Sequence, residues 1–325
     1  MSLSPLLALG FAVSALATHD TVKVERQAVR FSNANIELAA TLLRPVLPGR
    51  HPALVVIHGS GNSDRSNPWT TAYADALASR GIVVLYPDKR GSGESGGSWK
   101  TSSFQELATD ASAGIALLRK RTDVDTARIG VIAFSQGGYV AAVVAAQDSS
   151  CKLVAVVSGG VATLLDQTVD ELVIEAELAK APLAIPDELI LRRVYRQAFA
   201  AAQSGEGWGA LSDSIAHAGS RSAPLASALR SLPTDSTHWA YKWIRSTGDF
   251  DPVGFWKQVR RPVVFFYGGR DTQIRTRRSI ERFWEVVGSD TPNFAFGFLQ
   301  GNGHALFRDD VLGFLVGWLH DAGAN

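Results

Sequence analysis

Ser135 is the residue with the clearest chemical context, because it stands between a predicted strand and a predicted helix. Residues 129–134 are apolar and rich in β-branched side chains, as in a buried strand, and the small residues from Gly137 onward predict a helix. Such a turn exposes a serine as a nucleophile, and its usual pattern is G-x-S-x-G because larger side chains would collide with the neighbouring strand and helix. Here the pattern is A-F-S-Q-G, with Ala133 in the first small position. On this stretch alone, a nucleophile elbow and an ordinary strand-to-helix turn both remain open.

Two further side chains offer the groups that a serine nucleophile needs. A serine hydroxyl reacts poorly at neutral pH, so a base must take its proton, and a carboxylate must orient that base. Asp271 and His304 each follow a predicted apolar strand in the last quarter of the chain. Because the carboxyl ends of parallel strands meet at one edge of a sheet, we expect both side chains to lie near Ser135. Asp166, soon after an earlier strand, is an alternative for the carboxylate.

The elements that must position these residues alternate between strand and helix. Residues 22–44 predict an antiparallel hairpin. After the hairpin, continuous apolar strands alternate with helical segments, which indicates an α/β fold with a mostly parallel sheet covered on both faces. The predicted strands are 53–57, 82–86, 129–134, 153–157, 263–267 and 294–299, and the predicted helices are 69–79, 104–121, 137–146, 275–287 and 309–320.

The alternation stops between the core segments 18–160 and 261–325. Residues 161–260 have apolar side chains at helical spacing and no strand pattern. We therefore predict a helical cap, inserted after the sixth strand of the core. A dimer surface is the alternative role for this segment, so a homo-oligomer stays open. Its tryptophans are Trp208, Trp239, Trp243 and Trp256.

Length and composition restrict the class of function. With 325 residues the chain can bury a substantial core. The net charge of +1 produces no long-range field that would favour nucleic acid or an anionic membrane as partner. The single cysteine, Cys151, excludes an intrachain disulfide and a thiolate metal cluster.

The N-terminus has the pattern of an export signal. Residues 6–17 form a short apolar run that ends in A-L-A, a small-x-small site suited to signal peptidase. The run is too short to span a bilayer, which needs about 20 apolar residues, so we expect no stable membrane insertion. We expect residues 1–17 to be a signal peptide and the protein to be periplasmic or secreted. No Lys or Arg precedes the run, so a local apolar helix or a mis-assigned start is the alternative.

Taken together, these motifs resemble those of the α/β-hydrolase superfamily over nearly the whole mature chain. The order Ser135, Asp271, His304 is the order of its catalytic residues, and residues 58–61, H-G-S-G, follow an early strand where these enzymes place an oxyanion-hole amide. The loop 88–95 reads D-x-R-G-x-G-x-S. More narrowly, the chain is similar to a capped bacterial carboxylesterase branch, akin to dienelactone hydrolases and prolyl-oligopeptidase-like enzymes.

The resemblance implies a serine carboxylesterase that acts on small to medium acyl esters. Ser135 would form the acyl-enzyme, His304 would be the base, and Asp271 would orient it. The backbone N–H groups of Ser60 and Gln136 would bind the oxyanion, and neither a metal nor an organic cofactor is needed. Two alternatives remain: a peptidase or amidase with the same triad, and a binding protein with a degenerate triad.

Overall fold

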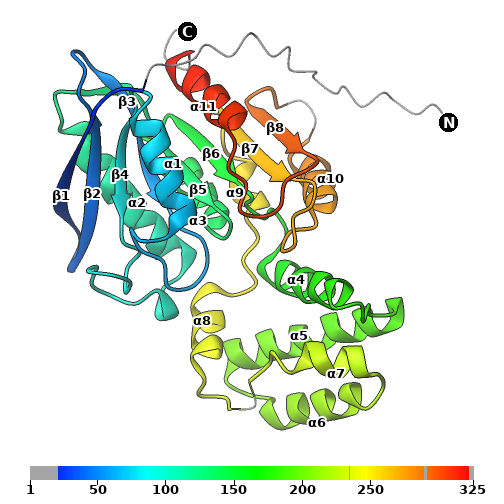
Figure 1. Ribbon diagram of the computed structural model, residues 1–325. Coiled ribbons are helices and arrows are strands. Elements are labelled where there is room, and N and C mark those ends of the chain that lie inside the picture. The colour runs from blue at the N-terminus through cyan, green and yellow to red at the C-terminus, as the bar shows by residue number, and fades with distance from the viewer. Residues whose placement is uncertain (1–20, 234, 289–290, 322–325) are drawn as a thin grey trace.

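The computed structural model describes residues 21–233, 235–288 and 291–321, and these form one sheet with helices on both faces (Figure 1). The strands lie in the order β1-β2-β4-β3-β5-β6-β7-β8. β2 runs antiparallel to both of its neighbours, and every other pair is parallel, so the predicted α/β class and the N-terminal hairpin are confirmed. The strands are β1 (Val24–Asn33), β2 (Ile36–Pro45), β3 (His51–Ile57), β4 (Val83–Pro87), β5 (Val124–Phe134), β6 (Leu153–Val157), β7 (Val263–Gly268) and β8 (Phe294–Leu299).

Burial explains why the central strands are apolar throughout. Every residue of β3, β6 and β7 is buried, as expected where helices cover both faces of a parallel sheet. One face packs against α1 (Pro68–Ala78) and α11 (Asp309–Asp321), whose apolar side chains form one core cluster. The other face packs against α2 (Phe104–Arg119), α3 (Gly137–Gln147) and α10 (Thr276–Val287), and the short helix η1 (Trp99–Thr101) precedes α2.

Local signals set where these helices begin. The Asn67 side chain accepts hydrogen bonds from the N–H groups of Trp69 and Thr70, and Pro68 occupies the first turn of α1. Ser103 and Glu106 form a capping box at the start of α2. β5 begins at Val124, five residues before the predicted start at residue 129, because residues 125–128 are polar or exposed and lack the apolar pattern of a buried strand.

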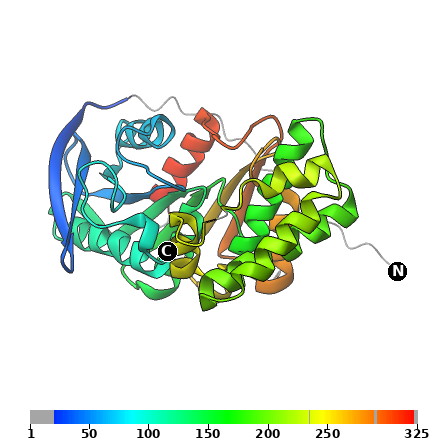
Figure 2. The ribbon, with the colours of Figure 1, turned by 90° about the horizontal axis from the view of Figure 1, so that it is seen from below.

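Between β6 and β7 the chain forms a helical insertion, which in Figure 1 extends below the carboxyl ends of the strands. Figure 2 views the molecule from this side and shows α4 to α7 over the half of the sheet that holds β7 and β8. The last insertion helix instead joins the core, since its Trp256 packs on Phe265 of β7. The helices are α4 (Leu164–Leu178), α5 (Ile185–Ser204), α6 (Trp208–Gly219), α7 (Ala223–Leu229), α8 (Trp239–Thr247) and α9 (Val253–Trp256).

Two further features concern membranes and export. No helix in the described ranges is both long and apolar enough to cross a bilayer. The predicted signal peptide, residues 1–17, lies outside the described residues.

Candidate active site

Ser135 occupies a strained turn between β5 and α3, as the elbow pattern predicts. Its φ angle is +51°, in the left-handed region that a residue other than glycine adopts only at a cost of about 1–3 kcal/mol. Its N–H donates to the carbonyl of Val157, and its own carbonyl accepts from Gly138, so the turn is fixed on both sides. A Cβ at Gly137 would lie 2.7 Å from the carbonyl oxygen of Ile57. Ala133, fully buried, fits the first small position.

The structure brings Ser135, His304 and Asp271 into one chain of hydrogen bonds. The Ser135 hydroxyl lies 3.0 Å from Nε2 of His304, and Nδ1 of His304 lies 2.9 Å from Oδ2 of Asp271. The Asp271 side chain is only 1% exposed, and its Oδ1 accepts the N–H groups of Gln273 and Ile274. A carboxylate held in this way accepts a hydrogen bond from the Nδ1–H group of His304 and so fixes the tautomer of the ring. Nε2 is then left as the acceptor for the serine proton.

The loop that carries His304 is held by residues that the sequence did not single out. Ser158, buried at the end of β6 with φ +51°, donates its hydroxyl to the carbonyl of His304 at 2.7 Å. Trp69 and Tyr73 on α1 both donate to the carbonyl of Leu306, two residues later. The Trp69 ring also packs 5.6 Å from the His304 ring, centroid to centroid. The only sequence signal for Ser158 was its place directly after a predicted strand.

Ser60 and Gln136 are the residues that the sequence predicts to form the oxyanion hole. Both line a cavity of about 220 Å³ together with Ser135 and His304. Within the described part of the chain, no acceptor takes the backbone N–H of either residue, so both N–H groups are available to a ligand. Gly59 lets the loop come this close, because a Cβ there would lie 3.2 Å from Cβ of Ser135.

The insertion forms the opposite wall of this cavity. Thr168 and Glu171 of α4 and Trp243 of α8 line it, and the same three residues line a second cavity of about 220 Å³. Burial raises the pKa of the Glu171 carboxyl above its ordinary value, and the nearby Glu175 raises it further. The second cavity is otherwise largely apolar and aromatic, with Leu172, Tyr195, Phe199, Trp239, Tyr241 and Ile244 in its walls.

The remaining sequence candidates lie elsewhere. Asp166 lies in the first turn of α4, where its N–H donates to the capping hydroxyl of Thr163, and its carboxylate pairs with Arg192 of α5 at 2.7 Å. The carboxylate bonded to His304 is Asp271. Trp208 packs on Tyr241 and lines neither cavity. Among the described residues, no group of three or more His, Cys, Asp or Glu side chains is arranged to hold a metal ion.

His58 orders the loop that carries Ser60. Its Nε2 donates to the carbonyl of Pro87 at 2.7 Å, and its Nδ1 accepts the hydroxyl of Ser63 at 2.9 Å. Burial lowers the pKa of His58 to about 4, so its ring is neutral around pH 7.

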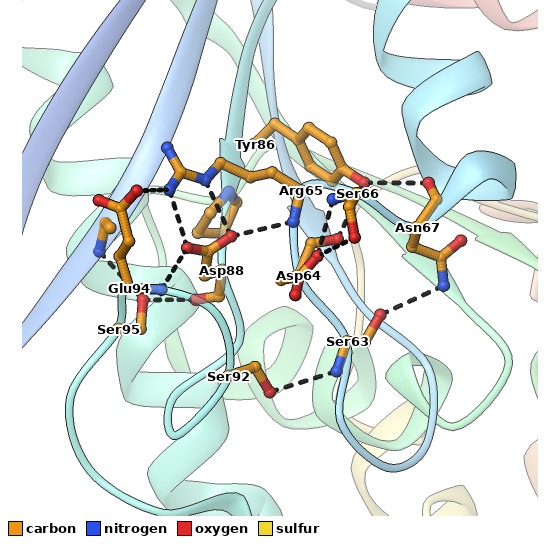
Figure 3. Close-up of polar contacts among 12 residues, drawn as sticks. Ser63, Asp64, Arg65, Ser66, Asn67, Tyr86, Asp88, Ser92, Glu94 and Ser95 are labelled. Carbon is orange, nitrogen blue, oxygen red and sulfur yellow. Dashed lines mark hydrogen bonds and ion pairs between the residues drawn. The ribbon is translucent and has the colours of Figure 1, made fainter.

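A polar network joins this loop to the D-x-R-G-x-G-x-S loop (Figure 3). Asp88 accepts two hydrogen bonds from the Arg65 guanidinium and one from the N–H of Glu94. Burial alone would raise the pKa of Asp88, but these bonds hold it below its ordinary value. The N–H of Ser63 donates to the hydroxyl of Ser92 at 3.2 Å, so the two loops form one unit.

One relative of this chain, by sequence and by structure, is a protein of Pseudomonas aeruginosa. The chain is 34% identical over 138 residues to the uncharacterized protein PA2218 of Pseudomonas aeruginosa, a match that spans 41% of this chain and 37% of that protein. The crystal structure of PA2218 superposes on 99% of both chains with a TM-score of 0.61 and 20% identity.

Two solved esterases have a similar structure. The esterase Pf2001 of Pyrococcus furiosus matches with a TM-score of 0.59 and 18% identity, over 93% of this chain and 90% of that one. Est1E of Butyrivibrio proteoclasticus, with ferulic acid bound, matches with a TM-score of 0.58 and 16% identity, over 92% and 100%. At these identities the likeness shows the fold, and the fold is that of the α/β hydrolases.

The family model for X-Pro dipeptidyl-peptidase (S15 family) matches residues 34–303, which include β2 to β8, the insertion, Ser135 and Asp271. β1 and His304 lie just outside this range. The chain thus has the α/β-hydrolase fold and matches the family model over most of its length. It belongs to the S15 family.

Proposed function

We propose that this protein is a serine carboxylesterase in which Ser135, His304 and Asp271 form the catalytic triad. The observation that carries the proposal is the unbroken chain of hydrogen bonds from the Ser135 hydroxyl through both nitrogens of His304 to the buried Asp271. A degenerate binding protein would not need to keep all three groups in this order and at these distances. The left-handed backbone of Ser135 also costs stability, and a catalytic role for the exposed hydroxyl explains why the fold keeps this strain.

The chemistry follows from the geometry. Nε2 of His304 takes the hydroxyl proton as the oxygen of Ser135 attacks the ester carbonyl, and Asp271 stabilises the imidazolium that forms. The N–H groups of Ser60 and Gln136 donate to the oxyanion, and each such donor is worth about 2.7–4 kcal/mol in the transition state. His304 then protonates the leaving alcohol. Water repeats the attack on the acyl-enzyme and releases the acid.

The two adjoining cavities favour an ester with one extended apolar or aromatic group. The reacting carbonyl would lie beside Ser135, and the extended group would pass Trp243 into the aromatic second cavity. In this proposal the helical insertion, residues 161–260, is a cap that selects the substrate while the core performs the chemistry. Ferulic acid bound to the structurally similar Est1E is consistent with an aromatic group, and Pf2001 is itself an esterase.

A second candidate function is amide hydrolysis at the end of a peptide. The family is described as an X-Pro dipeptidyl-peptidase family, and the Glu171 carboxylate in the cavity wall offers a partner for a protonated amine. Because the pKa of Glu171 is raised, its charge and any preference for amines would weaken as the pH falls.

A parallel substrate panel tests both functions. We expect turnover of p-nitrophenyl esters, with a preference for longer or aromatic acyl groups, and little turnover of aminoacyl-prolyl p-nitroanilides. The variant Glu171→Gln separates the two functions, because it removes the charge and keeps the shape. Unchanged ester turnover in this variant supports the esterase. A higher kcat/KM for the anilide than for any ester, lost in Glu171→Gln, would replace the esterase with the peptidase.

A further inference from the structure

Lys89 is a buried cation behind the loop that carries the Ser60 N–H. Its side chain starts from the D-x-R-G-x-G-x-S loop, and the whole residue is only 9% exposed. Its ammonium donates to the carbonyl of Gly59 at 2.9 Å and to the carbonyl of Gly61 at 3.2 Å. Within the described residues no carboxylate lies at ion-pair distance from it, and its ammonium also lies over the Trp99 ring, 5.5 Å from the centroid.

One of these hydrogen bonds acts on the peptide group of Ser60, the residue whose N–H is proposed to bind the oxyanion. The carbonyl of Gly59 and the N–H of Ser60 belong to the same peptide group. The ammonium donates to the oxygen of this group, and Ser60 lines the cavity of Ser135. A cation on the oxygen draws electron density from the nitrogen and makes the N–H a stronger donor, and such cooperativity is largest where water is excluded. The second bond, to Gly61, fixes the peptide on the other side of Ser60.

We propose that Lys89 is a positioning residue for the oxyanion hole: its ammonium polarises and orients the Gly59–Ser60 amide, so that the Ser60 N–H stabilises the oxyanion. The inference rests on the proposed function, because it requires an oxyanion formed at Ser135. A buried charge without a carboxylate partner costs stability, so a purely structural role does not explain a lysine at this position.

The loop has separate anchors that do not use the ammonium. Arg65 and Asp88 hold its far end, and the Ser63–Ser92 hydrogen bond joins it to the neighbouring loop, as Figure 3 shows. Loss of the Lys89 charge should therefore leave the loop folded. Ser92→Ala removes one of these anchors without touching the Gly59 carbonyl, which makes it a matched control.

The charge on Lys89 is expected to change near neutral pH, because burial lowers the pKa of its amine to about 7. The charged groups around it are His58, Asp88, Lys100 and the Arg90–Asp110 pair. His58 is neutral in this range, Asp88 is held by Arg65, and Lys100 lies over the same Trp99 ring. The polarising effect is therefore full below pH 7 and is lost as the pH rises through 7.

The test is the variant Lys89→Met, which keeps the length of the side chain and removes its charge. At pH 6.5 we expect kcat for an ester to fall by about tenfold with KM nearly unchanged, and the inhibition constant of a trifluoromethyl ketone, which forms an oxyanion on serine, to rise by a similar factor. The ratio of wild-type to variant kcat should shrink toward one between pH 6.5 and pH 8.5. Ser92→Ala should show neither effect.

Three outcomes would overturn the inference: wild-type kcat in Lys89→Met, equal losses in Lys89→Met and Ser92→Ala, or a kcat ratio that does not change with pH. If Lys89→Met does not fold, the shorter neutral variant Lys89→Gln is assayed in the same way. Should neither fold, the affinity of the wild-type enzyme for the trifluoromethyl ketone must weaken above pH 7, and a constant affinity overturns the inference. Turnover that survives in Ser135→Ala would instead overturn the proposed function itself.

Discussion

At the scale of single residues, the account depends on which carboxylate orients the base. His304 Nδ1 lies within 3.0 Å of both Asp271 oxygens, whereas Asp166 is paired with Arg192. Replacing a carboxylate with an amide at the orienting position leaves the shape intact but favours the wrong imidazole tautomer, and in a serine protease triad this lowers kcat by about 10⁴.

We therefore expect Asp271→Asn to reduce kcat by roughly 10³–10⁴ while its unfolding temperature stays close to that of the wild type. Asp166→Asn is the matched control and should keep at least half of the wild-type kcat. Steady-state ester hydrolysis with both purified variants makes the comparison. A larger loss in Asp166→Asn than in Asp271→Asn would reverse the assignment.

At this scale, the pH dependence of folding stability tests the buried, neutral ring of His58. Its folded-state pKa of about 4 lies below the ordinary value of about 6.5, so the unfolded chain binds the proton more readily between these values. Stability from this group is therefore full above pH 6.5 and is lost as the pH falls toward 4. Urea unfolding at pH 7 and pH 5 measures it, and His58→Asn should show a smaller difference between the two. An equal difference in both proteins would argue against the neutral, buried ring.

At the scale of elements, α4 and α8 of the insertion contribute residues to the walls of both cavities. Trp243 of α8 lines both cavities, and Trp208 of α6 lines neither. A methylene group in an apolar enzyme pocket changes the transition-state free energy by about 1–3 kcal/mol, so pocket shape has a large effect on selectivity.

We expect Trp243→Ala to change the ratio of kcat/KM between long and short acyl esters by about tenfold, and Trp208→Ala to leave this ratio within twofold of the wild type. Sedimentation velocity on both variants addresses the alternative, in which the insertion is a dimer surface. If Trp243→Ala kept the wild-type selectivity and lost an oligomer, the insertion would not be a cap that selects the substrate.

At the scale of the whole molecule, the sequence predicted those features that depend on nearby residues. The apolar runs before Ser135, Asp271 and His304 are local patterns, and the order of strands and helices follows from them. The observed bounds of β6 and β8 agree with the predicted segments 153–157 and 294–299.

What the sequence did not predict depends on contacts between distant segments. Ser158 binds the carbonyl of His304, 146 positions later, and Lys89 reaches carbonyls about 30 positions earlier. Glu171 is one of several acidic residues of α4, and only the folded insertion turns it toward the catalytic cavity. No periodicity encodes such contacts, because they are set by how elements pack after they form.

The most direct test of the central claim is to label the enzyme with a fluorophosphonate and map the modified peptide. The account predicts one labelled residue, Ser135, with labelling and ester turnover both lost in Ser135→Ala while the far-UV circular dichroism spectrum is unchanged. Modification of a different serine, or turnover near the wild-type rate in folded Ser135→Ala, would contradict it.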